Sequence, residues 1–182
     1  MSEMKKRLQR RGARKGFTLV ELLIVIIIIG ILAGAMMLVA GTSRDAAEAS
    51  KIISDLRNMK AAVLMWMADN PTTITKTDWD GKHTDQATLD KLNKYLDRPL
   101  IKDAHPFVFK VETGKDKYGK SYEVWLLGYN LANVRAGVKD KLASQAASAG
   151  LFGGDGNGIG TWPLTDLLYY KSSQDYIWIV IQ

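Results

Sequence analysis

The most apolar part of the chain lies near its N-terminus, between Phe17 and Ala40. Of these 24 residues only Thr18 and Glu21 are polar, and the others are apolar or glycine. As an α-helix the segment is about 36 Å long, because each residue adds about 1.5 Å. That length is enough to cross a hydrocarbon layer of about 30 Å. The pattern therefore predicts a membrane-spanning helix over residues 17–40.

A second pattern begins directly after this segment. Apolar residues recur at spacings of three and four with charged residues between them, which is typical of an amphipathic helix. The apolar positions are Ala46, Ala49, Ile52, Ile53, Leu56, Met59, Val63 and Met67. The pattern ends at Asp69-Asn70-Pro71, because the residue before a proline is disfavoured in helical conformation. We expect one helix over residues 17–69, whose second half, 41–69, packs one face against a partner.

The partner is the remaining sequence, 71–182, which predicts an α+β head. Runs rich in Val, Phe, Tyr and Trp at 106–113 and 121–130 predict an antiparallel hairpin with a charged tip at 114–120. Residues 175–182, DYIWIVIQ, predict a final buried strand, and Trp125 and Trp178 are expected in the core.

Helices and loops complete the predicted head. A short helix is expected at 85–97, before Pro99, and a second helix at 133–149. Residues 71–84 are polar and predicted to be irregular. Six of residues 150–160 are glycine, which predicts a flexible loop.

The charge of the chain is confined to one end. The formal net charge is +6, and residues 1–16 carry seven basic side chains against one acidic side chain. The rest of the chain holds 18 basic and 18 acidic residues and is neutral. A basic block before an apolar helix favours a cytoplasmic leader and an exported body. The sequence pI of about 9.4 would therefore describe only the precursor, which still carries the leader.

Three interpretations of the N-terminal segment compete. The first is a cleaved secretory signal, because Ala33-Gly34-Ala35 matches the Ala-x-Ala pattern of a signal-peptide cleavage site. The apolar run is, however, longer than usual for such a signal and continues past that site. A plain single-span anchor is the second. Neither explains Glu21, because a carboxylate in an apolar span costs on the order of 2–3 kcal/mol near the bilayer centre. In the third, cleavage between Gly16 and Phe17 creates an amine that Glu21 of a neighbouring subunit neutralises.

The junction Lys15-Gly16-Phe17-Thr18-Leu19-Val20-Glu21-Leu22 resembles that of type IV pilins and type II secretion pseudopilins. In both, a basic leader ends in Gly and is followed by Phe, a nearby Glu and a long apolar helix; the close match covers about residues 5–70. The resemblance implies a pilin-like α+β fold, in which the long N-terminal helix packs on a small antiparallel sheet.

The resemblance also implies a sequence of partners. A membrane prepilin peptidase would cleave after Gly16, and Phe17 would be N-methylated. The chain would sit in a bacterial inner membrane as a single-pass precursor. An assembly platform with an ATPase would then build it into a helical homo-oligomeric filament at the cell surface or in the periplasm, through contacts that include Phe17 and Glu21.

The chain departs from the family in two respects, one in the head and one in the apolar helix. The chain has no cysteine, so the C-terminal disulfide found in many pilins is impossible. Many major pilins have a proline partway along the apolar helix, whereas here only Gly30, Gly34 and Gly41 could loosen it. Pilin, pseudopilin and a membrane-tethered binding protein that does not polymerise therefore all stay open.

Other chemistry has little support in the sequence. The only histidines, His83 and His105, are far apart and are expected to be exposed or hydrogen-bonded. No phosphate-binding glycine motif is present, so we expect neither an enzyme nor a cofactor. A neutral body gives no charge excess for phosphate binding, so nucleic acid is not an expected partner. The segment from Asp155 to Asp166 partly follows a calcium-loop spacing, but Ile159 replaces an oxygen ligand, which favours a plain loop.

Overall fold

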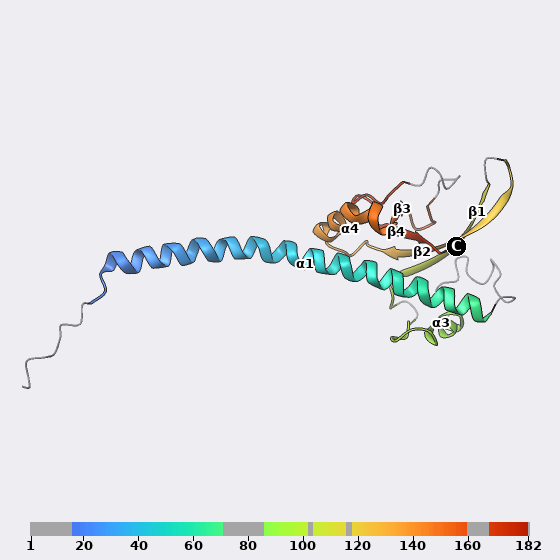
Figure 1. The fold of residues 1–182 in the computed structure, drawn as a ribbon, viewed down its shortest axis with the longest axis horizontal. Helices are drawn as coiled ribbons and strands as arrows, with labels where there is room; N and C mark the ends of the chain where they lie inside the picture. Colours follow the sequence, from blue (N-terminus) through green and yellow to red (C-terminus); the bar gives the residue numbers. More distant parts are fainter. Residues whose placement is uncertain (1–15, 71–85, 102–103, 116–117, 160–167, 182) are drawn as a thin grey trace, which may run out of the picture. The chain divides into compact units, whose positions relative to one another are not determined.

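The computed structural model describes residues 16–70, 86–101, 104–115, 118–159 and 168–181. It divides into two compact units, with the boundary between Gly41 and Thr42. The helices are α1 (Leu19–Asp69), α3 (Gln86–Asn93) and α4 (Ala136–Ala149), and the strands are β1 (Phe107–Lys115), β2 (Ser121–Asn130), β3 (Phe152–Gly154) and β4 (Tyr176–Val180), as drawn in Figure 1. The expected α+β class, with a long N-terminal helix and a small antiparallel sheet, is confirmed.

Helix α1 is 51 residues long and continuous, close to the predicted bounds of 17–69. None of the three glycines in its sequence interrupts it. The helix ends at Asp69 because Asn70 precedes Pro71, and the Asn70 side-chain amide donates to the carbonyl oxygen of Trp66 at 2.9 Å. From Ala49 to Val63 the apolar stripe is buried, as the amphipathic pattern predicts, and Met67 is partly buried.

The sheet has the strand order β1-β2-β4-β3, and every neighbouring pair is antiparallel. The predicted hairpin is confirmed as β1 and β2, with Phe107 opposite Tyr129 and Lys115 opposite Ser121. Strand β1 extends to Lys115, so the predicted tip at 114–120 is too long by two residues. Strand β4 lies between β2 and β3, which explains why its residues are buried on both faces.

Alternation along the strands creates two apolar clusters, one on each face of the sheet. The inner face packs against α1 and α4 through Phe109, Val111, Trp125, Leu127, Ile177 and Ile179. The outer face carries a smaller cluster of Val124, Leu126, Ile159 and Trp178. The exposed fractions of the Trp125 and Trp178 side chains are 7% and 0%, so both tryptophans belong to the core as expected.

The prediction of a flexible glycine-rich loop at 150–160 is wrong for most of that segment. Residues Phe152–Gly154 form β3 along β4, and Asp155 and Gly158 exchange backbone hydrogen bonds in a tight turn. The indole N–H of Trp178 donates to the carbonyl oxygen of Asp155 at 3.1 Å. On the other side of the turn, the Ile159 N–H donates to the Glu112 carboxylate at 3.0 Å. Glycine is needed at Gly158 because its φ is 125° and the Glu112 carboxylate fills the space of a side chain.

Both shorter helices exist but are shorter than predicted. Helix α3 ends at Asn93, whose side-chain oxygen accepts the Leu100 N–H at 2.6 Å and so turns the chain. Helix α4 begins three residues late, because the Asn130 side chain bonds the Ala132 N–H and shapes a turn before it. Its C-cap is Gly150, which adopts a left-handed conformation with φ of 68°. The Gly150 N–H donates to the carbonyl oxygen of Ala146. The predicted irregular segment 71–84 lies outside the described residues.

Tyr170 gives the head a measurable dependence on alkaline pH. Burial, followed by the negative charges of Asp175 and Asp140, raises the pKa of Tyr170 to about 12. Because this folded-state pKa exceeds the ordinary value of 10.0, the neutral phenol stabilises the head below pH 10, and that stability is lost as pH rises towards 12. We therefore expect the difference in unfolding free energy between wild type and Tyr170→Phe to shrink over this range. Denaturant titrations from pH 9 upward measure it, and a constant difference would contradict the assignment.

Candidate processing and assembly site

The start of α1 is closed by reciprocal hydrogen bonds between Thr18 and Glu21. The Thr18 backbone N–H donates to Glu21 Oε2 at 2.8 Å, and the Thr18 hydroxyl donates to the same oxygen at 2.8 Å. In return, the Glu21 backbone N–H approaches the Thr18 hydroxyl oxygen at 3.2 Å. The Leu22 N–H donates to the Thr18 carbonyl oxygen, which is the first helical hydrogen bond. Thr18 is thus the N-cap of α1, and Glu21 is the third helical residue.

This arrangement is a capping box, in which an N-cap Thr and a Glu three residues later satisfy each other's backbone N–H groups. It matters more in lipid than in water, because free N–H groups at a helix end have no solvent there. The acidic group at the helix start also complements the positive end of the helix dipole. Sequence reasoning found Glu21 and missed the role of Thr18, although the Thr-x-x-Glu spacing before an apolar run was the available signal.

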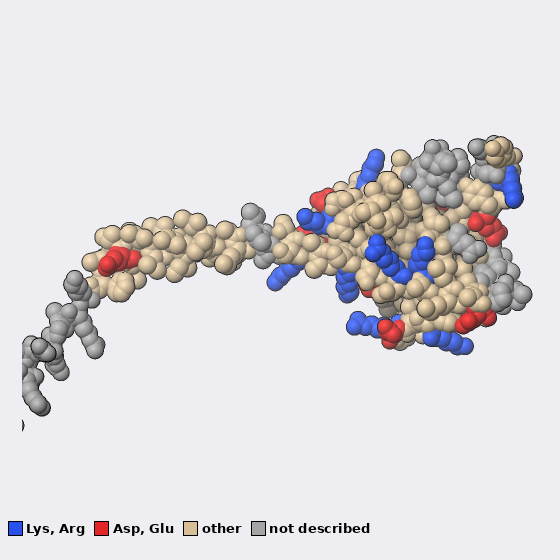
Figure 2. Space-filling view, viewed as in Figure 1, with Lys and Arg blue, Asp and Glu red and all other residues tan. Residues whose placement is uncertain are grey.

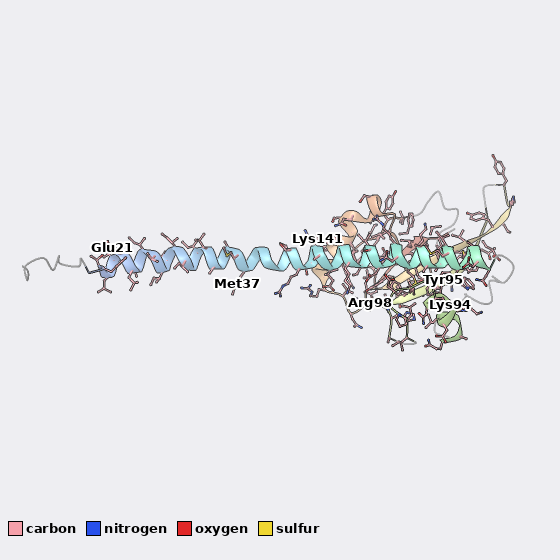
Figure 3. The ribbon with its side chains drawn as sticks, turned by 60° about the horizontal axis from the view of Figure 1, so that its bottom comes forward. Glu21, Met37, Lys94, Tyr95, Arg98 and Lys141 are labelled. Carbon is pink, nitrogen blue, oxygen red and sulfur yellow. The ribbon has the colours of Figure 1, made fainter. Side chains whose placement is uncertain are left out.

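Only one oxygen of Glu21 is used by these bonds. Both recorded bonds end on Oε2, and Oε1 accepts no hydrogen bond from the described residues. The carboxylate therefore has capacity for an additional donor while it continues to cap the helix. Figure 3 shows Glu21 at the beginning of α1.

The predicted cleavage junction lies immediately before this cap. Gly16 and Phe17 are in irregular conformation, outside the helix, and both are exposed. The Phe17 side chain is 83% exposed, and no atom lies within 4 Å of the place where a Cβ of Gly16 would be. The structure thus brings Gly16, Phe17, Thr18 and Glu21 together within one turn of the helix start.

The helix that follows presents an apolar surface on all sides. Every described large apolar side chain from Leu19 to Met37 is at least 46% exposed. An 18-residue stretch of α1 is long and apolar enough to cross a membrane, a property that signal sequences share, and none of it is buried. Figure 2 shows this segment without Lys or Arg among its described residues, and with acidic atoms only near its start. Such a surface requires lipid or other protein to cover it.

Among the residues that the structure describes, the other candidates form no second site. His83 and Asp166 lie outside the described residues, and His105 lies just before β1 with its ring 6.3 Å from that of Phe107. Asp155 Oδ1 accepts the Asn157 N–H at 2.7 Å and so belongs to the tight turn. Within the described ranges, no three His, Asp or Glu side chains converge as a metal site would require.

Comparison with known proteins gives one match to a family model and matches to about a third of the chain in two relatives. Residues 11–37 match the model of the prokaryotic N-terminal methylation motif. The type II secretion system core protein G of Klebsiella michiganensis is 39% identical over 67 residues, which are 35% of this chain and 47% of that protein. The protein of the same name from Klebsiella pneumoniae is 36% identical over 63 residues, or 33% and 45% of the two chains.

These alignments leave most of the chain unmatched. The chain spans about half the length of the curated relatives it matches. No solved structure matches it. The methylation motif covers the capped start of α1 and most of its apolar segment. The methylation motif over residues 11–37 and the partial similarity to core protein G support a relationship to the family of type IV pilins and type II secretion pseudopilins.

Proposed function

We propose that the chain is the structural subunit of a type IV pilus-like filament, which assembles through the apolar first part of α1. The observation that carries this proposal is the exposure of that segment from Leu19 to Met37 on every side. A bilayer covers such a surface before assembly, and a bundle of identical helices covers it in a filament. A soluble monomer could leave it open to water only at a large hydrophobic cost.

Processing is the first step of the proposed function. A prepilin peptidase cleaves the precursor after Gly16, and the new N-terminal residue, Phe17, is N-methylated. The irregular backbone and the exposure of both residues support this step, because a peptidase needs an extended, accessible segment. The leader, 1–16, carries the whole net charge of +6, so processing leaves a body with equal numbers of acidic and basic side chains.

Assembly then uses the free capacity of Glu21. In the inner membrane, the single-pass subunit keeps its carboxylate satisfied by Thr18. In the filament, Glu21 Oε1 accepts the Phe17 amine of a neighbouring copy, while Oε2 continues to cap its own helix. Two groups that are costly in an apolar environment thereby neutralise each other and set the register between subunits. An assembly platform with an ATPase supplies the energy for extraction from the membrane.

A second candidate is a pseudopilin of a type II secretion system. The name of the matched relatives, core protein G of that system, favours it. Deleting the chain separates the two functions: loss of surface filaments with intact protein secretion indicates a pilin, and accumulation of secretion substrates in the periplasm indicates a pseudopilin. If the chain is instead a membrane-tethered protein that never polymerises, its deletion should leave both the surface filaments and protein secretion intact.

Mass spectrometry of the protein purified from its native cells tests processing directly. We expect an N-terminus at methylated Phe17, and Gly16→Leu should leave the leader attached because the junction loses its small residue. An N-terminus at Met36 would instead indicate an ordinary signal peptide cleaved after Ala33-Gly34-Ala35. Normal processing of Gly16→Leu would contradict the proposed junction. Ala33→Leu, which changes only the signal-peptide site, is the matched control and should be processed normally.

A further inference from the structure

One cavity of about 310 Å³ lies in the unit formed by residues 42–182. Its walls come from α1, the end of α4, the start of β3 and the end of β4. Side chains of the core, among them Leu56 and Leu151, form an apolar floor. The only charged groups among its lining residues are Arg57 and Lys60, which lie one turn apart on α1. The lining therefore combines apolar side chains with backbone polar groups and two cationic side chains.

The cavity lies beside the end of β4, at the point where its neighbour β3 no longer pairs with it. Strand β4 lies between β2 and β3, and the backbone N–H and C=O groups of successive residues point alternately towards these two neighbours. Odd-numbered residues face β2, as shown by the Ile181 N–H, which donates to the Trp125 carbonyl oxygen at 2.7 Å. The backbone N–H and C=O groups of Val180 therefore point towards the β3 side. Strand β3 begins only at Phe152, so it provides no strand partner for Val180. The end of β4 is thus an open strand edge inside the cavity.

Lys60 satisfies only one of the two backbone groups of Val180 at this edge. Its ammonium group donates to the Val180 carbonyl oxygen at 2.8 Å. The Val180 N–H has no acceptor among the described residues, and Arg57 forms no ion pair with them. By contrast, Arg135 pairs with Asp45 and Glu48. Two cations and one backbone N–H therefore line a cavity that offers them no carboxylate.

We propose that this cavity binds an extended peptide segment of a partner protein that carries a carboxylate beside apolar side chains. The peptide would add a short strand to the open edge of β4, and its backbone carbonyl would accept the Val180 N–H. Its carboxylate would lie between Arg57 and Lys60, and an apolar neighbour would cover the floor. Charge complementarity selects this occupant, because a neutral or basic peptide would leave two cations without counter-charges. The proposal does not depend on whether the chain polymerises.

The test uses the full chain in lipid nanodiscs and two fluorescent peptides. The first is acetyl-Thr-Val-Glu-Val-Thr-amide, and the second has Gln in place of Glu. Fluorescence anisotropy should show that the Glu peptide binds at least about tenfold more tightly, because hydrogen bonds to charged groups are the stronger ones. The double variant Arg57→Gln/Lys60→Gln should lose this preference. The matched variant Arg44→Gln/Lys51→Gln, on the same helix but outside the cavity, should retain it.

Charge reversal distinguishes a binding site from an indirect effect on folding. In Arg57→Glu/Lys60→Glu, a peptide with Lys at the central position should bind better than the Glu peptide. Circular dichroism should show unchanged structure for Arg57→Gln alone, because this side chain makes no hydrogen bond or ion pair with the described residues. Equal binding of the Glu and Gln peptides would overturn the proposal. So would the absence of binding by either peptide at millimolar concentration, or loss of binding in the Arg44/Lys51 control.

Discussion

Replacement of Glu21 by alanine should abolish filament assembly while the head remains folded. The variant loses both functions of the carboxylate, which are the cap on Thr18 and the proposed pair with a neighbouring Phe17 amine. Removal of one partner from a buried ion pair costs about 3–5 kcal/mol, so the yield of filaments should fall at least about tenfold. Loss of the cap alone costs only about 1 kcal/mol.

Replacement by glutamine separates the two functions. A glutamine oxygen can still accept the Thr18 N–H, because Glu and Gln both serve at the third position of a capping box. It cannot neutralise an amine. If pairing drives assembly, Glu21→Gln should be nearly as defective as Glu21→Ala. Filament formation at wild-type level by Glu21→Gln would show that the residue serves only as a cap.

The measurement compares sheared filaments with total membrane protein by immunoblot in cells that contain the assembly machinery. Glu123→Ala, which removes an exposed carboxylate from β2, is the matched control and should assemble normally. Mass spectrometry should confirm that each variant is processed at the same position, so that a processing defect is not mistaken for an assembly defect. Normal filaments from Glu21→Ala would refute the pairing argument.

Gly128→Ala is expected to destabilise the head strongly, although it adds only one methyl group. A Cβ at this position would lie 2.7 Å from Cε3 and Cζ3 of Trp178, whose side chain is fully buried. The indole would have to move, and its N–H would leave the Asp155 carbonyl oxygen. Overpacking of this kind costs roughly 2–3 kcal/mol. For a chain of this size the melting temperature should fall by about 5–10 °C.

A double-mutant cycle tests whether Trp178 is the cause. Trp178→Leu removes the ring, so Gly128→Ala should cost much less in that background than in the wild type. Thermal denaturation monitored by circular dichroism gives the four stabilities. Gly41→Ala, where no atom lies within 4 Å of the new methyl group, should not be destabilising. Additive effects of Gly128→Ala and Trp178→Leu would show that the clash with the indole is not the origin of the loss.

The N-terminal segment was predicted almost completely from the sequence because its information is local. Composition alone defines the apolar helix, the Asn70-Pro71 step ends α1, and Gly16, Phe17 and Glu21 are adjacent in the chain. The Thr18–Glu21 cap is also local, and the Thr-x-x-Glu spacing could have predicted it. The hairpin was found by the same kind of reasoning, since its two strands are neighbours in sequence.

The glycine-rich segment and the end of β4 needed the tertiary structure, because their partners are distant in sequence. Glycine content predicted a flexible loop at 150–160, whereas pairing with β4 and bonds from Trp178 and Glu112 hold it in place. No local pattern could show that β3 begins at Phe152 and leaves Val180 without a strand partner. The sequence by itself thus determined the long apolar helix, the N-terminal methylation motif and the α+β class. Only the three-dimensional packing decided which glycines are confined and where a cation-lined strand edge stays open, because both depend on contacts between residues far apart in the chain.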